Sequence, residues 1–234
     1  MLRQFKGFSY FTEMSDIINR LEDHVASARM KTTPVIDFEK NESLKGLDYL
    51  DTIYHAIVNE HPIQLKYRSF KARSANSFIF YPYLLKEYRN RWFVYGVRGN
   101  GRILQNLALD RIQSLEVLPQ EHYIKNTFFD PNTFFDDLVG VTKNSGSVAE
   151  KIGFKVAAAE APYIITKPIH RSQQVVERLA DGSVILEIEV VINHELERVF
   201  FGYAEGIQVL YPKTLVELMG RKLKKAAEQY THSK

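Results

Sequence analysis

The sequence predicts an α+β protein with three parts: an N-terminal helical segment, a small antiparallel β-barrel and a C-terminal α+β sandwich domain. Three observations predict it. Apolar residues first recur at helical spacing, then alternate in short runs separated by turns after His61-Pro62, and finally follow strand and helix patterns in turn. The 234 residues, 45% of them hydrophobic, provide enough apolar material for one large or two small domain cores.

Residues 1–60 are predicted to be a helical linker or dimerisation segment. An amphipathic helix is expected from the apolar spacing of Met14, Ile17, Ile18, Leu21 and Val25. An extended link follows around Pro34. A second helix, with Ser43 as its N-cap, is expected to have an apolar face made of Leu44, Leu47, Leu50, Ile53, Tyr54, Ile57 and Val58.

Residues 61–120 are predicted to form the barrel, since five short strands with tight turns favour a small, strongly curved sheet. The strands are expected at 63–67, 78–88, 91–97, 103–110 and 112–119. Pro82 within the second strand indicates an edge position or a bulge, because proline cannot donate to the ladder. The third strand, "RWFVYGV", is apolar on both faces, so we expect it to be buried on both sides.

Residues 121–147 are predicted to be a connector and residues 148–234 a second domain. In the connector, four phenylalanines are expected to dock as a lid or short helix, and "TKNSGS" to be a flexible linker. The second domain is expected to place helices on one sheet face, with strands at 151–157, 184–193 and 207–211 and helices at 172–179, 195–205 and 215–230.

Several protein classes are excluded by composition. The chain has no cysteine, which rules out disulfides, Cys-ligated zinc, iron–sulfur clusters and thiol nucleophiles. The N-terminus lacks the apolar core of a secretory signal, and no apolar run approaches the roughly 20 residues of a membrane span. We therefore expect a soluble, cytoplasmic protein with no membrane partner.

No catalytic or metal-binding motif is found. The seven histidines are scattered without HExxH spacing, and the glycines of "GVRGNGR" suit a hairpin turn better than a phosphate loop. Asp136 and Asp137 are adjacent and therefore diverge, so helix capping is favoured over acid–base chemistry. We expect no metal, no cofactor and no enzymatic activity.

Charge is separated along the chain. Residues 61–111 carry ten Lys/Arg against Glu87 and Asp110, a balance of +8, although the whole chain carries only +3. A solvated basic face is one interpretation of this excess, and an anion-binding lobe is the other. An aromatic and basic small barrel is physically suited to short nucleic acid, because bases stack on rings while Lys and Arg neutralise phosphates.

The barrel segment resembles the WYL-domain family of bacterial proteins. The family's Trp-Tyr-Leu triplet corresponds to Trp92-Phe93-Val94, its first-strand ending to Leu65-Lys66-Tyr67, its proline to Pro82 and its closing "LDRI" to residues 109–112. Residues 148–230 resemble the C-terminal extension domain that follows WYL domains, notably in "PIHRSQQV" and "NHELERVFFGYAEGIQVLYP".

The resemblance implies a transcriptional regulator. An Sm-like or SH3-like barrel would sense an anionic ligand, such as a nucleotide or single-stranded nucleic acid, and the extension domain would help to form a homodimer. Duplex DNA would be bound only through an upstream winged helix-turn-helix, for which this sequence has no room. Either the sequence is a truncated form of a longer protein, which we favour, or the protein carries no DNA-binding domain of this kind.

The candidate ligand-binding residues are aromatic, basic or amide side chains of the barrel: Tyr67, Arg68, Arg89, Arg91, Trp92, Phe93, Gln105, Asn106 and Arg111. Gln105-Asn106 stand where the family usually has an arginine, so one phosphate contact becomes neutral and a ligand less charged than a polynucleotide is indicated.

Some of these candidates have a competing structural role. Alternating aromatics favour a core role for Trp92, and Arg111 could simply pair with Asp110. His170 and Gln173 are expected to cap the following helix or to form hydrogen bonds between domains. A constitutive Sm-like module that binds RNA or single-stranded DNA without switching is the alternative function.

Overall fold

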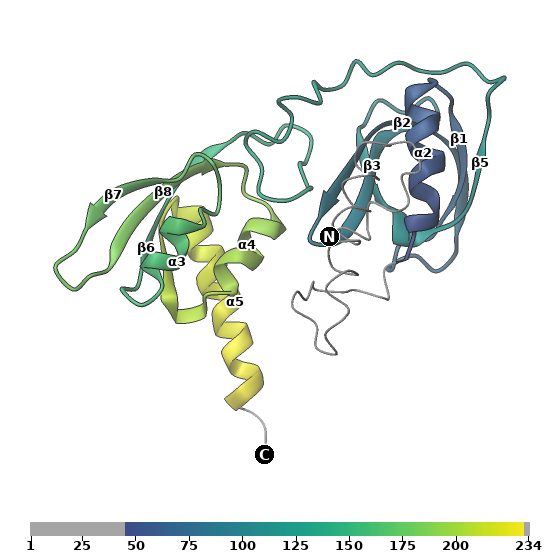
Figure 1. Cartoon of the computed structure of the whole chain (residues 1–234). Helices are drawn as coiled ribbons and strands as arrows, with labels where there is room; N and C mark the ends of the chain where they lie inside the picture. The colour runs from purple at the N-terminus through teal and green to yellow at the C-terminus, as the bar shows by residue number, and fades with distance from the viewer. Residues whose placement is uncertain (1–44, 232–234) are drawn as a thin grey trace, which may run out of the picture. The chain divides into compact units, whose positions relative to one another are not determined.

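The computed structural model describes residues 45–231, shown in colour in Figure 1. The chain divides into two compact units between Phe129 and Asp130, and each is described by itself. The predicted amphipathic helix between Met14 and Val25, the link around Pro34 and the Ser43 cap lie outside the described residues.

The first unit begins with a short helical segment. A 3-10 turn, η3 (Leu47–Tyr49), leads into helix α2 (Leu50–Val58). The helix starts later than predicted because Gly46 has a φ of 85°, a left-handed conformation that interrupts helical geometry. A Cβ at this position would lie 2.4 Å from the carbonyl carbon of Leu109, so the close approach of the two backbones also requires glycine.

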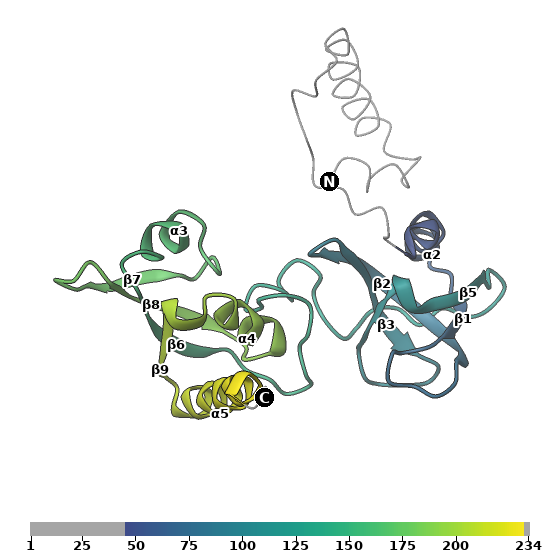
Figure 2. The ribbon, with the colours of Figure 1, turned by 90° about the horizontal axis from the view of Figure 1, so that it is seen from below.

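Five strands follow in an antiparallel sheet, with the order β4-β3-β2-β1-β5. Their bounds are β1 (Ile63–Tyr67), β2 (Asn76–Tyr88), β3 (Arg91–Arg98), β4 (Gln105–Ala108) and β5 (Ile112–Val117), with a 3-10 turn η4 (Leu109–Arg111) between the last two. All five predicted strands are confirmed, with shifted ends. Figure 2 shows this sheet with α2 beside it in the view from below.

The sheet is open and curved. No ladder joins β4 to β5 in the described part of the chain, so the predicted closure into a barrel is not confirmed. However, the three residues of η4 carry the chain from one sheet edge to the other. Four Cα steps span at most ~15 Å, whereas four strand spacings in a flat sheet amount to ~19 Å. The sheet must therefore bend strongly across its width.

Pro82 lies at a bulge in β2. The pairing of β2 with β3 shifts register between Pro82 and Leu84, and β2 is an interior strand between β3 and β1. The bulge interpretation of this proline is therefore confirmed. Because β1 pairs with β2 only as far as Phe80, Pro82 also lies where β2 has no ladder partner on that side. Four consecutive residues of β3, from Val94 to Val97, are buried, as the two-sided apolar pattern predicted.

Two apolar layers cover the two faces of this sheet. On one face, α2 contributes Leu50 and Ile53 to a core with residues of every strand. On the other face, Tyr81, Tyr83 and Val97 contact residues 123–129 of the connector. The connector forms no helix within the described residues, and only Phe128 and Phe129 of its four phenylalanines pack here, so the short-helix prediction is wrong.

The second unit has the element order β6 (Glu150–Val156), α3 (Ala161–Thr166), β7 (Gln174–Arg178), β8 (Val184–Val190), α4 (His194–Phe201), η5 (Ala204–Gly206), β9 (Ile207–Tyr211) and α5 (Lys213–Thr231). Its antiparallel sheet has the order β7-β8-β6-β9. A βαββαβ chain with this order is the ferredoxin-like arrangement, to which α5 is added.

One predicted helix is wrong. Residues 172–179 were expected to be helical, but residues 174–178 form β7, paired with β8 at the sheet edge. All five residues of β7 are exposed, so no buried helical face exists, and the β-branched pair Val175-Val176 favours the extended backbone. Helix α3 was not predicted. It begins at Ala161 and has Pro162 in its first turn, where a proline is tolerated.

The three helices of the second unit pack on one face of its sheet, as predicted. Alternate residues Ile152, Phe154 and Val156 of β6 are buried, and Phe154 contacts Phe200 of α4 with ring centres 5.1 Å apart. The same core contains residues of α3, α4 and α5. None of the helices found between residues 45 and 231 is long and apolar enough to cross a membrane.

Candidate functional site

A shallow pocket lies where β1 ends and η4 begins. Its volume is about 300 Å³, and its lining consists of Arg68, Ser69, Phe70, Asp110, Arg111, Ile112 and Gln113. The antiparallel pairing of β1 with β5 places Tyr67 opposite Ile112, with a register shift at this end. The backbone N–H of Arg68 donates to the carbonyl of Arg111 at 3.1 Å, which joins the two loops that form the pocket.

An arginine and an exposed phenylalanine form one wall of this pocket. The guanidinium carbon of Arg111 lies 4.4 Å from the ring centre of Phe70, within the range of a cation–π contact. Phe70 is 73% exposed, so most of its ring surface is open to solvent. An exposed aromatic ring held beside a guanidinium can stack with a planar group while the cation attracts an anionic one.

Asp110 brings two arginines together. Its carboxylate lies 3.3 Å from Nε of Arg91, which comes from the start of β3, and 3.8 Å from Nε of Arg111. The Asp110 side chain is only 15% exposed, whereas that of Arg91 is 47% exposed. The carboxylate therefore orients the two guanidinium groups from the interior, and both remain accessible from the solvent side.

Tyr67 lies behind Arg111. Burial raises the pKa of the Tyr67 hydroxyl, and this effect is opposed by the charge of Arg111, a backbone hydrogen bond at Ala108 and a hydrogen bond with Arg111. The phenol therefore stays protonated at neutral pH. It is better placed to hold the Arg111 side chain than to bind a ligand directly.

The structure brings together four of the nine predicted site residues. Arg68 and Arg111 line the pocket, Tyr67 contacts Arg111, and Arg91 is connected through Asp110. The sequence interpretation in which Arg111 pairs with Asp110 is compatible with this site, because one side of the guanidinium also contacts Phe70.

The other five predicted residues do not line the pocket. Arg89 lies in the β2–β3 turn with a φ of 50°, and its guanidinium is 5.5 Å from the Tyr88 ring. Trp92 is half-buried and packs against the core of the first unit. Phe93 pairs with Ala108, whereas Gln105 and Asn106 pair with residues at the far end of β3 from Arg91.

Phe70 was not among the predicted site residues, and it lies between the predicted strands 63–67 and 78–88. Its signal is an aromatic residue between Arg68 and Lys71 in a polar stretch that follows a strand. An apolar ring in such a loop has no strand neighbours to bury it, so exposure could have been anticipated.

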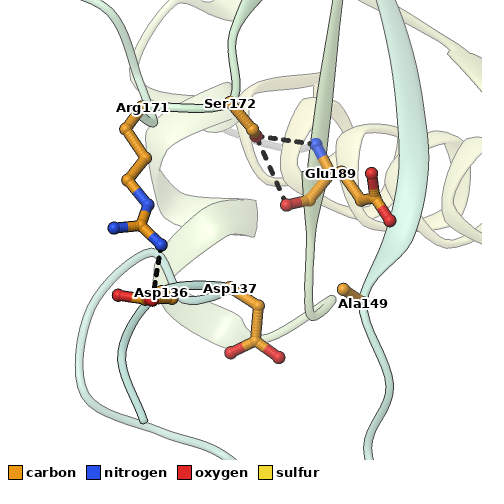
Figure 3. Close-up of a pocket in the computed structure, with 6 residues that line it drawn as sticks. All are labelled: Asp136, Asp137, Ala149, Arg171, Ser172 and Glu189. Carbon is orange, nitrogen blue, oxygen red and sulfur yellow. Dashed lines mark hydrogen bonds and ion pairs between the residues drawn. The ribbon is translucent and has the colours of Figure 1, made fainter. Parts of the chain in front are cut away.

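A second pocket, with a volume of about 450 Å³, lies in the second unit (Figure 3). Its lining residues are Asp136, Asp137, Ala149, Arg171, Ser172 and Glu189. Asp136 pairs with Arg171 at 2.7 Å and Asp137 with Lys143 at 2.8 Å. The two aspartates cap no helix, so that prediction is wrong. Their charges are balanced by these cations, which favours a structural role.

His170 and Gln173 stabilise the loop before β7. Gln173 donates through Nε2 to the carbonyl of Ile164 and accepts from the N–H of Ile169, both at 3.0 Å. Nδ1 of His170 lies 2.8 Å from Oγ of Ser172. Burial, followed by the charge of Arg171, lowers the pKa of His170. Because a strand follows this loop, the predicted helix cap is wrong.

No cluster of histidine, aspartate or glutamate suited to a metal ion occurs among residues 45–231. The fold and the pocket thus define a two-domain α+β protein, in which a curved antiparallel sheet with an arginine-lined pocket precedes a ferredoxin-like domain with an extra helix. Residues 48–117 match the family described as WYL domain, and residues 149–227 match the family described as WCX domain. The chain therefore carries a WYL domain followed by a WCX domain.

Two solved structures resemble this chain. One is proteasome accessory factor B/C (PafBC) of Arthrobacter aurescens, with 15% identity and a TM-score of 0.33, over 82% of this chain and 28% of that chain. The other is a CRISPR Cas-related protein, with 12% identity and a TM-score of 0.46, over 80% of this chain and 52% of that chain. This chain thus spans about half or less of their length. No curated protein matches it.

Proposed function

We propose that this chain is the effector-sensing and oligomerisation region of a bacterial transcriptional regulator, in which the pocket beside Phe70 binds an anionic nucleotide-like ligand or single-stranded nucleic acid. The curved sheet would act as an Sm-like barrel, and the regulator would be a homodimer. The succession of a WYL and a WCX domain supports this proposal. Contact with duplex DNA would come from a helix-turn-helix outside this sequence.

The observation that carries the proposal is the pairing of Phe70 with Arg111 beside Arg68. A nucleobase can stack on the open face of the ring, which contributes about 1–3 kcal/mol per base. Its phosphate can then accept hydrogen bonds from the guanidinium groups, whose planar donors suit phosphate oxygens. The base and the phosphate of a nucleotide could therefore be bound in the same pocket, by the Phe70 ring and by the guanidinium groups.

The size and charge of the pocket favour a short ligand. Its volume of about 300 Å³ lies at the small end of ligand sites, which suits a single nucleotide unit. Arg68 and Arg111 line the pocket together with Asp110, and Asp110 also pairs with Arg91. Gln105 and Asn106 lie at the other end of β3, so they offer no continuation of this anion site.

The test begins with the full chain purified at low salt. Co-purified nucleotide or oligonucleotide is detected by the absorbance ratio and by mass spectrometry, and binding of cyclic nucleotides and short oligonucleotides is measured by calorimetry. We expect Arg68→Ala and Arg111→Ala to weaken binding at least 10-fold. Arg102→Ala, an exposed arginine of the β3–β4 turn, is the matched control and should bind normally.

Failure of the whole panel to bind at low ionic strength would overturn the proposal. The salt dependence of ligand affinity distinguishes the proposed effector pocket from a constitutive Sm-like module that binds RNA or single-stranded DNA. A long run of phosphate contacts gives a steep fall of affinity with salt and little base preference, whereas a one-nucleotide pocket gives a shallow slope and a preference for one ligand. We further propose that the chain is not an enzyme, so any bound nucleotide should be recovered unchanged by chromatography.

A further inference from the structure

Helix α5 has two halves with different surroundings. Its first half is part of the core of the second unit, where Leu215 is 1% exposed and Met219 is 6% exposed. Every residue from 220 to 231 is exposed. Figure 1 shows the helix continuing beyond the other elements of its unit. Lys222 forms an ion pair with Glu197 of α4, but the second half is otherwise a helix surface of about three turns with every residue exposed.

This exposed half has an apolar stripe. Leu223, Ala226, Ala227 and Tyr230 follow one another at spacings of three, one and three residues, which places them on one face of the helix. Leu223 is 42% exposed and Tyr230 is 86% exposed. Burying this stripe against an apolar surface would remove a large aromatic ring and a leucine from water, which is favourable.

The stripe is symmetric along the chain. Reading outward from the point between Ala226 and Ala227, each side has one alanine and then a large apolar residue, Tyr230 or Leu223. A two-fold contact between identical subunits needs a surface that is complementary to itself, so that residue i meets j and j meets i. Two antiparallel copies of this stripe meet that condition, with large residues at the ends and small ones at the centre.

The charges favour the antiparallel orientation. Lys222 and Lys224 flank the stripe, but Lys222 pairs with Glu197 of its own unit, so the argument from charge rests on Lys224. Two parallel helices would bring Lys224 beside its own copy. In the antiparallel pair, Lys224 instead lies beside the C-terminal turn of the other helix, whose unpaired carbonyls carry partial negative charge. Arg221 and Lys225 lie on the opposite side of the helix from the stripe. A polyanion bound by them would leave the apolar residues uncovered.

We infer that the second half of α5 is a self-association surface, on which residues 223–230 pack antiparallel against the same residues of a second copy of this chain. The inference rests on the homodimer in the proposed function but is independent of the ligand. A helix pair of three turns buries less than the roughly 1,200 Å² of a standard stable interface. The dimer should therefore depend strongly on protein concentration unless other surfaces contribute.

The first test uses sedimentation of the full chain over a wide concentration range. We expect Leu223→Glu and Tyr230→Glu to weaken dimerisation at least 10-fold while the circular dichroism of the folded chain is unchanged. Tyr163→Glu is the matched control, since Tyr163 is 69% exposed on α3, and it should dimerise normally. Dimers unaffected by the α5 variants would overturn this surface but leave the homodimer standing. A wild-type monomer at every concentration would overturn both.

The second test uses the absence of cysteine from the chain. Under mild oxidation, a mixture of Leu223→Cys and Tyr230→Cys chains should form disulfide-linked pairs, whereas each variant alone and Arg221→Cys should not. Cross-linking of Leu223→Cys with itself would indicate a parallel pair and overturn the antiparallel arrangement. Nucleotide binding by these variants should match the wild type, which separates this test from that of the ligand pocket.

Discussion

The guanidinium carbon of Arg111 lies 4.4 Å from the centre of the Phe70 ring, although Phe70 is 73% exposed. The two residues come from different loops, which the antiparallel pairing of β1 with β5 brings together at one end of the sheet. A large apolar ring in this position gains little stability from burial. Its contact with a cation beside a pocket is the observation on which the proposed ligand site rests.

Replacing Phe70 by alanine should separate binding from stability. Because the ring is mostly exposed, we expect the free energy of unfolding to change by less than about 0.5 kcal/mol. Loss of one stacked base should weaken nucleotide binding by about 1–3 kcal/mol, which is roughly 5-fold to 150-fold. Calorimetric titration together with urea denaturation measures both quantities.

Ile103→Ala is the matched control for that variant. Ile103 is also a large, exposed apolar residue of the first unit, with 67% of its surface open, but it lies between β3 and β4. It should bind the ligand as the wild type does. Equal affinities for Phe70→Ala and the wild type would show that the ring is not part of the site.

Asn193 should be important for the stability of the second unit. It is 6% exposed, its Oδ1 accepts from the N–H of Leu196 at the start of α4, and its Nδ2 donates to the carbonyls of Val139 and Thr142. Asn193→Ala removes the helix cap and leaves two carbonyls without this donor. We expect a loss of about 2–4 kcal/mol in the free energy of unfolding.

The control for this prediction is Asn132→Ala. Asn132 is exposed, and its hydrogen bonds to Asp130 stay within one turn. Denaturant unfolding should show a change below about 1 kcal/mol for this variant. If Asn193→Ala were no more destabilising than Asn132→Ala, the contact between α4 and the preceding loop would have no role in stability.

Two glycine substitutions should have opposite effects. A Cβ at Gly96 would lie 2.1 Å from the carbonyl oxygen of Tyr81 and 2.6 Å from the Phe80 ring, so Gly96→Ala should destabilise the first unit by about 1–3 kcal/mol. A Cβ at Gly220, in α5, meets no atom within 4 Å, so Gly220→Ala should stabilise by up to about 1 kcal/mol through helix propensity. Thermal unfolding of both variants gives the two signs.

Alkaline pH should weaken the first unit through Tyr83. Burial raises the pKa of the Tyr83 hydroxyl from 10.0 to about 12, with a smaller contribution from Tyr81. The folded state therefore holds this proton more tightly than the unfolded state. The stabilisation is complete below pH 10 and is lost as the pH rises toward 12. Urea unfolding between pH 7 and pH 12 should show this decline.

Tyr83→Phe should make that decline shallower without abolishing it, because burial also raises the pKa of the Tyr67 and Tyr123 hydroxyls. The buried hydroxyl of Tyr83 has no hydrogen-bond partner among the described residues, so removing it should leave stability at pH 7 unchanged or raise it by up to about 1 kcal/mol. Tyr230→Phe, at a tyrosine that is 86% exposed, should retain the wild-type profile. A decline above pH 10 that is as steep in Tyr83→Phe as in the wild type would show that Tyr83 does not contribute to it.

Local patterns in the sequence predicted the elements whose partners follow directly along the chain. The hairpin of β2 and β3, the bulge at Pro82 and the burial of Val94 to Val97 could be derived from alternation, turn residues and the missing N–H of proline. The strand at 174–178 could not be derived from local patterns. Its apolar residues suit a helix or a strand equally, and its pairing with β8, which is a non-local contact, decided between them.

For the site, the sequence by itself identified the basic segment and the arginines at positions 68, 91 and 111, because charge and residue type are local properties. The tertiary structure decided which of them lie together. Strand order places Arg68 and Arg111 in one pocket and leaves Gln105 at the far end of β3. The tertiary structure also places the exposed Phe70 beside Arg111. The pairing of β1 with β5, which are distant in the sequence, determines that these two segments meet.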